Sequence, residues 1–278
     1  MFKHVLLATD FSSPALLAAQ TAATFARAFE SRVTLLNVRD PSGSDDVATR
    51  LEALQLLRDE RFGHLPNVEF AVVEGSHPEI AIADHVSAHE VDLVVAGRHG
   101  EQNLQDRLLG TTTERLVRHV PTNVLVVHPA LREPLVLLKH VLVGSDFSEA
   151  SLPAVTTAGR IARALDAWVS LMHVYDLLPA TMELLEAPYR EGEEHTLAAA
   201  ITRKLESLQA SQLDGVPSEV VLVRNKNAVA GLCDFADNRD VDLLVVGTHG
   251  RTGLSRFLLG SVAERVVRHA PCSVLVVR

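Results

Sequence analysis

A long internal repeat constrains the fold of this chain more than any other feature of its sequence. Residues 108–121, LLGTTTERLVRHVP, recur 150 positions later as LLGSVAERVVRHAP, residues 258–271. Near the start of each copy, TDFS at residues 9–12 recurs 136 positions later as SDFS at residues 145–148. Two long copies indicate duplication and fusion, because a solenoid needs several short repeats. The offsets differ by 14, which predicts an insertion in the second copy between its second and fourth strands.

Length and composition support two globular domains. A chain of 278 residues is about two domains long, and 47% hydrophobic against 22% charged residues supplies ample apolar material for packed cores. Pro129 and Pro134 stop the strand before them and mark a linker. We therefore expect one domain over residues 1–130 and a second over 139–278.

Short apolar runs alternate with longer amphipathic stretches in both copies. The first copy predicts strands at 5–10, 33–38, 68–74, 92–97 and 123–128, and helices at 14–29, 45–62, 79–89 and 112–119. The second predicts strands near 141–146, 169–175, 219–224, 242–247 and 273–277. Nearly unbroken apolar strands are typical of sheets that helices cover on both faces. The pattern predicts two α/β domains, each a doubly wound, Rossmann-like sheet of five parallel strands, with ligands beyond the strands' carboxyl ends.

A glycine loop follows the fourth strand of the second copy. Its spacing is Gly247-x2-Gly250-x9-Gly260-Ser261, and the first copy repeats it as Gly97, Gly100, Gly110 and Thr111. Glycines let the backbone approach a ligand, and the start of a helix presents unpaired N–H groups at its positive end. The loop matches neither the Walker A spacing nor Gly-x-Gly-x2-Gly. The alternative interpretation is a tight strand-to-helix connection with Ser261 as a capping residue.

Three elements together resemble the tandem form of the universal stress protein family: the glycine loop, the strand-ending Asp-x-Ser, and the final Pro-x-x-Val-Leu-Val-Val strand. The resemblance covers essentially the whole chain. It implies binding of ATP, or of AMP or ADP. We expect Mg²⁺ on the phosphates, because hard cations prefer phosphate and water oxygens. Asp146 would lie near the ribose, the Val174 backbone would pair with the adenine edge, and Gly247, Gly250, Gly260 and Ser261 would hold the phosphates. The matching first-copy residues are Asp10, Val38, Gly97, Gly100, Gly110 and Thr111, and the predicted sites also include Thr9, Ser145, His249, Arg251 and Gly253.

The two predicted sites differ in charge. The second loop has Arg251-Thr252-Gly253 where the first has Glu101-Gln102-Asn103. Charges cancel over residues 97–111 and sum to +2 over 247–261. A carboxylate opposes a polyphosphate, whereas an arginine can fork onto it, so the second site is predicted to bind more tightly. Arg98 could compensate if it points at the ligand.

Other reactive side chains predict no metal site and no catalytic residue. His85 and His89 could face one metal from a helix, but spacing indicates no third ligand. His99 and His249 suit loop packing or phosphate contact better than acid–base catalysis. Cys272 precedes a buried strand, as a small core residue does.

Composition also excludes several classes of function. A net charge of −9 with 4% aromatic residues disfavours nucleic-acid binding. The start of the chain lacks the apolar core of a signal peptide, and residues 124–144 contain charges and prolines that a membrane span would not. Two cysteines without a CxxC motif suit a reducing compartment, so we expect the cytoplasm.

Three functional hypotheses follow. The first is an ATP-binding regulatory protein of stress responses, non-catalytic or weakly catalytic. The second is a slow ATPase or autophosphorylating enzyme, for which water and Mg²⁺ could suffice, and the third is a scaffold that no longer binds nucleotide. A two-component receiver is disfavoured, because neither fifth strand ends in lysine. The apolar final strands, 123–128 and 273–277, predict an intramolecular pseudo-dimer, and a further homodimer and any protein partner stay open.

Overall fold

The computed structural model describes residues 1–43, 46–99, 109–129, 138–176, 194–248 and 259–278. The strands are β1 His4–Ala8, β2 Arg32–Arg39, β3 Val68–Glu74, β4 Leu93–Gly97, β5 Asn123–Val127, β6 His140–Gly144, β7 Trp168–Tyr175, β8 Ser218–Arg224, β9 Leu243–Gly247 and β10 Ser273–Val277. The α-helices are α1 Ser13–Phe29, α2 Val47–Leu57, α3 Pro78–Ala88, α4 Thr111–His119, α5 Leu152–Leu165, α7 Glu194–Gln212, α8 Ala228–Asn238 and α9 Ser261–His269. A π-helical turn, Arg58–Phe62, continues α2, and a 3₁₀ turn, Glu149–Ser151, precedes α5.

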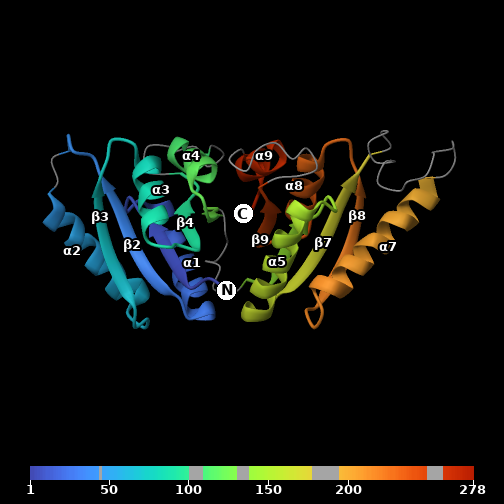
Figure 1. Ribbon diagram of the computed structural model, residues 1–278, viewed down its shortest axis with the longest axis horizontal. Helices are drawn as coiled ribbons and strands as arrows, with labels where there is room; N and C mark the ends of the chain where they lie inside the picture. The colour runs from blue at the N-terminus through green and yellow to red at the C-terminus, as the bar shows by residue number, and fades with distance from the viewer. Residues whose placement is uncertain (44–45, 100–108, 130–137, 177–193, 249–258) are drawn as a thin grey trace.

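In the described part of the chain, ten strands form one sheet in the order β3-β2-β1-β4-β5-β10-β9-β6-β7-β8 (Figure 1). Every pairing is parallel except the central one, where β5 and β10 run antiparallel. Each half is therefore a five-stranded parallel sheet, and the two halves are related as partners in a two-fold dimer. The predicted fold class is confirmed.

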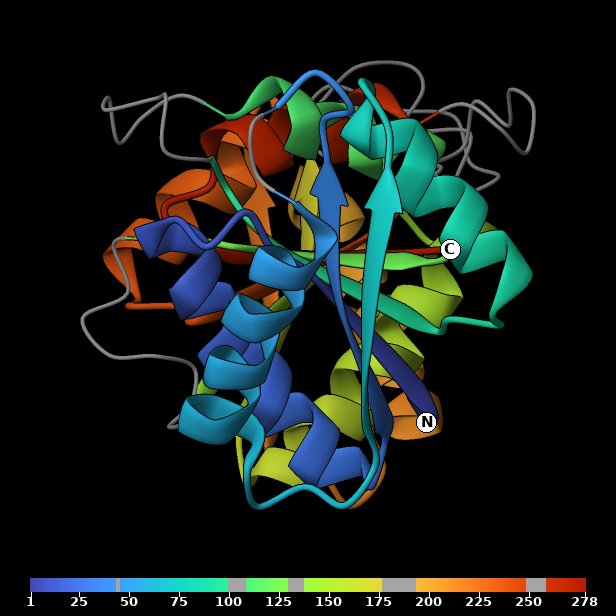
Figure 2. The same cartoon turned by 90° about the vertical axis from the view of Figure 1, so that its left-hand side faces the viewer.

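Helices cover both faces of each half. Figure 2 shows α2 and α3 on opposite sides of the strands of the first half. The face below α1, α2, α5 and α7 buries one apolar core, and the face below α3, α4, α8 and α9 buries the other. In α1, small residues at Ala18, Ala19 and Ala22 let the helix lie close against the sheet. Ser12 caps its start by accepting a hydrogen bond from the Ala15 N–H.

The predicted insertion lies between the second and third strands of the second half. β2 and β7 begin 136 positions apart, at residues 32 and 168, while β3 and β8 begin 150 apart, at 68 and 218. Within the described residues, α7 occupies the place that α2 and its π-helical turn occupy in the first half. Residues 177–193 of the inserted stretch lie outside the described part of the chain.

The two halves join through apolar strands at the centre of the sheet. Leu125 lies opposite Leu275, Val126 opposite Val274 and Val124 opposite Val276. Both leucines are 0% exposed, and each packs into the core below α1 and α5. The prediction that the two final strands pair within one chain is confirmed, so the junction is a continuous core.

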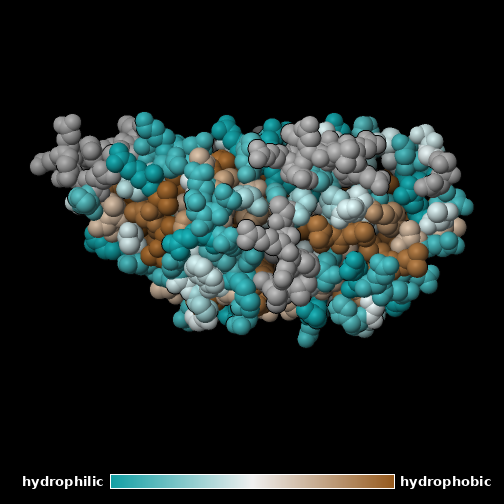
Figure 3. Space-filling view, turned by 180° about the vertical axis from the view of Figure 1, so that it is seen from behind, coloured by the Kyte–Doolittle hydropathy of each residue, from teal (hydrophilic) through white to brown (hydrophobic). Residues whose placement is uncertain are grey.

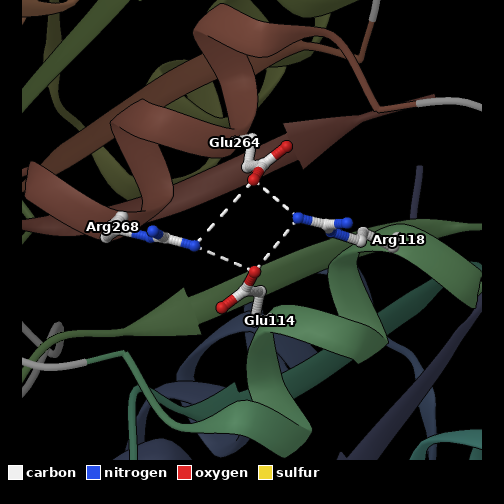
Figure 4. A network of polar contacts seen from close by, with 4 residues as sticks. All are labelled: Glu114, Arg118, Glu264 and Arg268. Atoms are coloured by element: carbon white, nitrogen blue, oxygen red, sulfur yellow. Dashed lines mark hydrogen bonds and ion pairs between the residues drawn. The ribbon is translucent and has the colours of Figure 1, made fainter.

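A closed ring of charges joins α4 to α9 above this junction (Figure 4). Arg118 contacts Glu264 at 2.6 Å and Glu114 at 3.1 Å, and Arg268 contacts Glu114 at 2.9 Å and Glu264 at 3.9 Å. These side chains are 26–45% exposed, so solvent screens each pair and its contribution is at most about 1 kcal/mol. The contacts cross the junction in both directions, so the ring links the two helices from both sides.

Hydrophilic residues predominate among the coloured residues on the face seen in Figure 3. On the face in Figure 3, apolar side chains gather in two areas, one over each half of the molecule. Among the described helices, none combines the length and the apolar character needed to cross a bilayer.

Candidate functional site

A cavity of about 360 Å³ opens at the carboxyl ends of β6, β7 and β9, beside the first turns of α8 and α9. Six residues predicted from the sequence line it: Ser145, Asp146, Val174, Gly247, Gly260 and Ser261. Lining residues that the sequence did not single out are Gly144, Ser151, Met172, His173, Ala228, Leu232, Val246, Thr248, Val262 and Ala263. The volume lies within the roughly 300–1,000 Å³ of small-molecule sites.

One wall of the cavity is β7, which runs on after its neighbour β6 has ended. The last paired residues are Gly144 and Met172, and the Ser145 N–H then donates to the Met172 carbonyl at 2.9 Å. In a parallel strand, residues two apart direct their N–H and C=O groups to the same side. Val174 therefore turns its backbone donor and acceptor toward the place that β6 has vacated. This puts a donor–acceptor pair on the cavity wall.

A tight turn after β6 fixes Asp146 at the cavity. One carboxylate oxygen of Asp146 accepts from the Ser148 N–H at 3.0 Å and from the Ser148 hydroxyl at 2.6 Å. Phe147 in this turn has a φ of 63°, which is uncommon for a bulky residue. Asp10, Ser12 and Phe11, with a φ of 65°, repeat the turn in the first half. The sequence Asp-Phe-Ser contains no glycine or asparagine at the position with positive φ, so this conformation could not be predicted from the sequence.

His173 contacts the same turn through a hydrogen bond and a ring contact. Its buried ring donates from Nδ1 to the Ser145 carbonyl at 2.7 Å and packs against Phe147, with ring centroids 4.6 Å apart. In the first half, Asn37 makes the equivalent bond, from Nδ2 to the Thr9 carbonyl at 2.8 Å. Different side chains thus hold the end of the first strand in the two halves.

The start of α9 forms the opposite wall. Gly260 is the N-cap residue and has no side chain with which to cap the first turn, whereas Asn227 caps the neighbouring α8. The Gly260 N–H donates to the Thr248 carbonyl at 2.7 Å, which ties the helix start to the end of β9. The next N–H groups lack intrahelical partners by geometry and carry the positive end of the helix dipole. This wall suits an anion.

The comparisons with known proteins give the family. The sequence profile of the universal stress protein family matches residues 1–128 and again 138–278. The chain belongs to the universal stress protein family. Universal stress protein MJ0531 of Methanocaldococcus jannaschii is 32% identical over 163 residues, which span 55% of this chain and 89% of that protein. A Staphylococcus aureus protein named for the same family is 28% identical over 145 residues, 52% of this chain and 86% of its own.

Solved structures of similar proteins support the fold. A functionally unknown Pseudomonas aeruginosa protein, PA1789, is 23% identical and superposes with a TM-score of 0.73, over 99% of this chain and 92% of its own. A universal stress protein of Archaeoglobus fulgidus is 17% identical with a TM-score of 0.69, over 100% and 99% of the two chains. At these identities the likeness concerns the fold alone.

The first domain of this universal stress protein places its predicted residues at the equivalent points. Thr9 and Asp10 follow β1, Val38 lies near the end of β2, Gly97 ends β4, and Gly110 and Thr111 open α4. Five of the neighbouring positions carry larger side chains in the first domain. Where the second domain has Gly144, Ser145, Gly231, Ser261 and Ala263, the first has the larger Ala8, Thr9, Ala81, Thr111 and Thr113.

Two of those glycines make room for the cavity of the second domain. A Cβ on Gly144 would lie 3.2 Å from Leu232 Cδ2, and one on Gly231 would lie 3.0 Å from Val174 Cγ2. Both neighbours line the cavity, so added carbons would push side chains into it. The missing methyl groups are therefore one physical reason that the second domain has space at this point.

Arg98 does not compensate for the two carboxylates of the first loop, Glu101 and Asp106. Its side chain is 3% exposed and turns away to the second domain, where it donates to the carbonyls of Ala270, at 2.8 Å, and Arg268. The alternative in which Arg98 contacts a ligand of its own domain is therefore wrong for this structure. The carbonyls at the end of α9 lack partners within the helix and lie at the negative end of its dipole, which suits a guanidinium group.

Several predicted residues lie outside the described part of the chain. They are Gly100, His249, Gly250, Arg251 and Gly253, together with the loop charges Glu101, Asp106 and Arg256. The prediction that the second site binds more tightly because of its loop charges stays a prediction.

The other reactive residues weighed in the sequence, His85, His89 and Cys272, contact neighbouring side chains or are buried. The His85 and His89 rings stack with centroids 3.9 Å apart, and no group of three or more metal-binding side chains occurs among the described residues. Burial raises the pKa of the Cys272 thiol to about 12, so it stays protonated at neutral pH and is a poor nucleophile.

Gly97 of the first loop serves packing. A Cβ on this residue would lie 2.9 Å from the backbone carbonyl carbon and oxygen of Pro14, at the start of α1. We expect Gly97→Ala to lower the free energy of unfolding by about 1–3 kcal/mol, because backbone atoms cannot move aside cheaply. Chemical denaturation measures this. Gly144→Ala is the matched control, since its Cβ meets only the flexible Leu232 side chain, and an equal loss there would contradict the argument.

Proposed function

We propose that this chain is an adenine-nucleotide-binding regulatory protein of stress responses, which holds ATP in the cavity of its second domain and hydrolyses it slowly or not at all. One observation carries the proposal. The cavity joins a backbone donor–acceptor pair at Val174 to a helix start without a side-chain cap at Gly260 and Ser261. A base edge and a phosphate chain need those two features at opposite walls of one site.

The wall beside Val174 suits a purine. Met172, Leu232 and Val246 line it with apolar side chains, against which a flat ring can pack. An adenine edge offers one donor and one acceptor, so the Val174 N–H and C=O can pair with both. Asp146 lies between this wall and α9, within the same cavity lining, and its carboxylate suits a ribose hydroxyl.

The wall at α9 suits the phosphates. The first N–H groups of α9 and the Ser261 hydroxyl supply donors, and the helix dipole favours negative charge. Mg²⁺ would be held by phosphate and water oxygens, which hard cations prefer, so no protein metal cage is required. By this arrangement, occupancy would stabilise or switch a surface that another protein recognises.

The test combines retained ligand with turnover. Nucleotide released from the purified, acid-denatured chain is identified, and the chain freed of nucleotide is titrated with ATP and with GTP in the presence of Mg²⁺. We expect tight binding of ATP, weaker binding of GTP, and hydrolysis slower than about one turnover per second, the lower end of ordinary enzymes.

Two results would contradict this proposal. No heat on titration with ATP and no released nucleotide would leave the scaffold hypothesis. Rapid hydrolysis, abolished by His249→Ala, would make the chain an enzyme with His249 in its chemistry.

A further inference from the structure

We propose that Arg98 of the first domain is a positioning residue for the nucleotide site of the second domain. This inference rests on the proposed function. Arg98 holds the far end of α9, the helix whose near end would contact the phosphates. The first glycine loop would then support its partner's site through α9.

The backbone around Arg98 follows the pattern of the other half, but the side chain does not. The Arg98 N–H donates to the Val127 carbonyl and its carbonyl accepts from the Gly110 N–H; Thr248 makes the equivalent bonds with Val277 and Gly260. Thr248 has a short side chain and lines the cavity. Arg98 instead reaches into the other domain, to residues 170 and 172 positions away in the sequence. Arg98 and Thr248 thus make the same backbone hydrogen bonds, but their side chains contact different parts of the molecule.

The two ends of α9 have different partners. Gly260 and Ser261, at its start, line the cavity, while the carbonyls of Arg268 and Ala270, at its end, accept from Arg98. α9 has nine residues and is about 13 Å long at 1.5 Å per residue, so one short run of helical hydrogen bonds connects its two ends. Carbonyls at a helix end lack intrahelical partners, and a buried guanidinium satisfies two of them and opposes the dipole. A change at Arg98 is therefore transmitted to the phosphate wall.

Arg278 provides a matched control. It belongs to the second domain and donates to the carbonyls of Val117, at 2.8 Å, and Arg118, at 3.4 Å, at the end of α4. The bonds are of the same kind and they also cross the junction, but α4 belongs to the first domain and contributes no residue to the lining of the cavity. Arg278→Ala should cost stability without reaching the nucleotide.

The experiment is calorimetric titration of Arg98→Ala, Arg98→Lys and Arg278→Ala, each with ATP and with adenosine, at a temperature at which every variant is folded. We expect Arg98→Ala to weaken ATP binding roughly five- to tenfold, the lower range of coupling between sites, and adenosine binding less than twofold. Adenosine lacks phosphates and would rely on Val174, on the wall of the cavity opposite the start of α9. Arg278→Ala should leave both affinities within about twofold of the unaltered chain. Arg98→Lys keeps a cation at the helix end and should lose less ATP affinity than Arg98→Ala.

The outcomes are distinct. A selective loss of ATP affinity in Arg98→Ala supports the inference, and so does a smaller selective loss in Arg98→Lys if the alanine variant does not fold. Unchanged ATP affinity in a folded Arg98→Ala variant, or in Arg98→Lys if the alanine variant does not fold, overturns it and leaves the proposed function standing, and so does an equal loss for ATP and adenosine. Absence of ATP binding by the unaltered chain overturns the proposed function, and this inference with it.

Discussion

Ser261→Asp is expected to remove tight ATP binding while leaving the fold as stable as before, or slightly more stable. Ser261 is the first residue of α9, its side chain is exposed, and it lines the cavity. A carboxylate there replaces a donor with a negative charge beside the phosphates. The same charge at the start of a helix is favourable for the helix itself, by about 0.3–1 kcal/mol. Affinity and stability should therefore change in opposite directions.

The expected loss of affinity is large. A hydrogen bond to a charged group contributes about 1.5–3 kcal/mol, and repulsion between like charges adds to its loss. A total near 3 kcal/mol corresponds to about a hundredfold weaker binding. Calorimetric titration with ATP measures the affinity, and thermal unfolding without nucleotide measures the stability.

Thr111→Asp is the matched control, because Thr111 is the first residue of α4 in the first domain. We expect it to leave the tight site unchanged. If Thr111→Asp abolishes tight binding and Ser261→Asp does not, then the tight site lies in the first domain, and the assignment of the second domain is wrong.

Leu125→Ala, in the first domain, is expected to destabilise the second domain as much as the first. Leu125 is fully buried opposite Leu275 at the junction, and removing a buried leucine side chain costs about 2–5 kcal/mol. Because the sheet and its cores run through the junction, both domains should unfold in one transition. The chain has a single tryptophan, Trp168 on β7, so its fluorescence reports on the second domain alone.

Denaturation followed by circular dichroism and by Trp168 fluorescence tests this. Both signals should shift together, since coincident transitions are the mark of two-state unfolding. Leu56→Ala is the control, because Leu56 is 65% exposed and its loss should change little. A Trp168 transition that stays in place while circular dichroism shifts would show that the domains unfold separately.

The strands could be predicted because each is a short apolar run with helical stretches on either side. The ends of β2 and β3, for example, agree with the predicted 33–38 and 68–74 to within a residue. The predicted helix 45–62 is less regular than expected, since it divides into α2 and a π-helical turn, Arg58–Phe62. Local apolar periodicity decides where an element lies, and side-chain packing decides how it ends.

Part of the candidate site could also be predicted from the sequence. Asp146 follows β6, Val174 lies near the end of β7 and Gly260 precedes α9, and parallel strands bring their carboxyl ends to one edge. The rest depended on contacts between distant residues. No local pattern indicates that Arg98 reaches Ala270, 172 positions away, or that Gly231 and Gly144 leave room for a cavity. Side-chain direction and free volume are properties of the packed molecule.

The covalent link between the halves has a consequence for how they can diverge. In a homodimer, one gene encodes both partners, so every substitution is made twice. A protein with arginine at the position of Arg98 would then have arginine at the position of Thr248 too, and long side chains would stand at both loops. A tandem chain can keep a long side chain at one loop and a short one at the other. Specialisation of one copy for support and the other for a ligand is open to the fused form and closed to a homodimer.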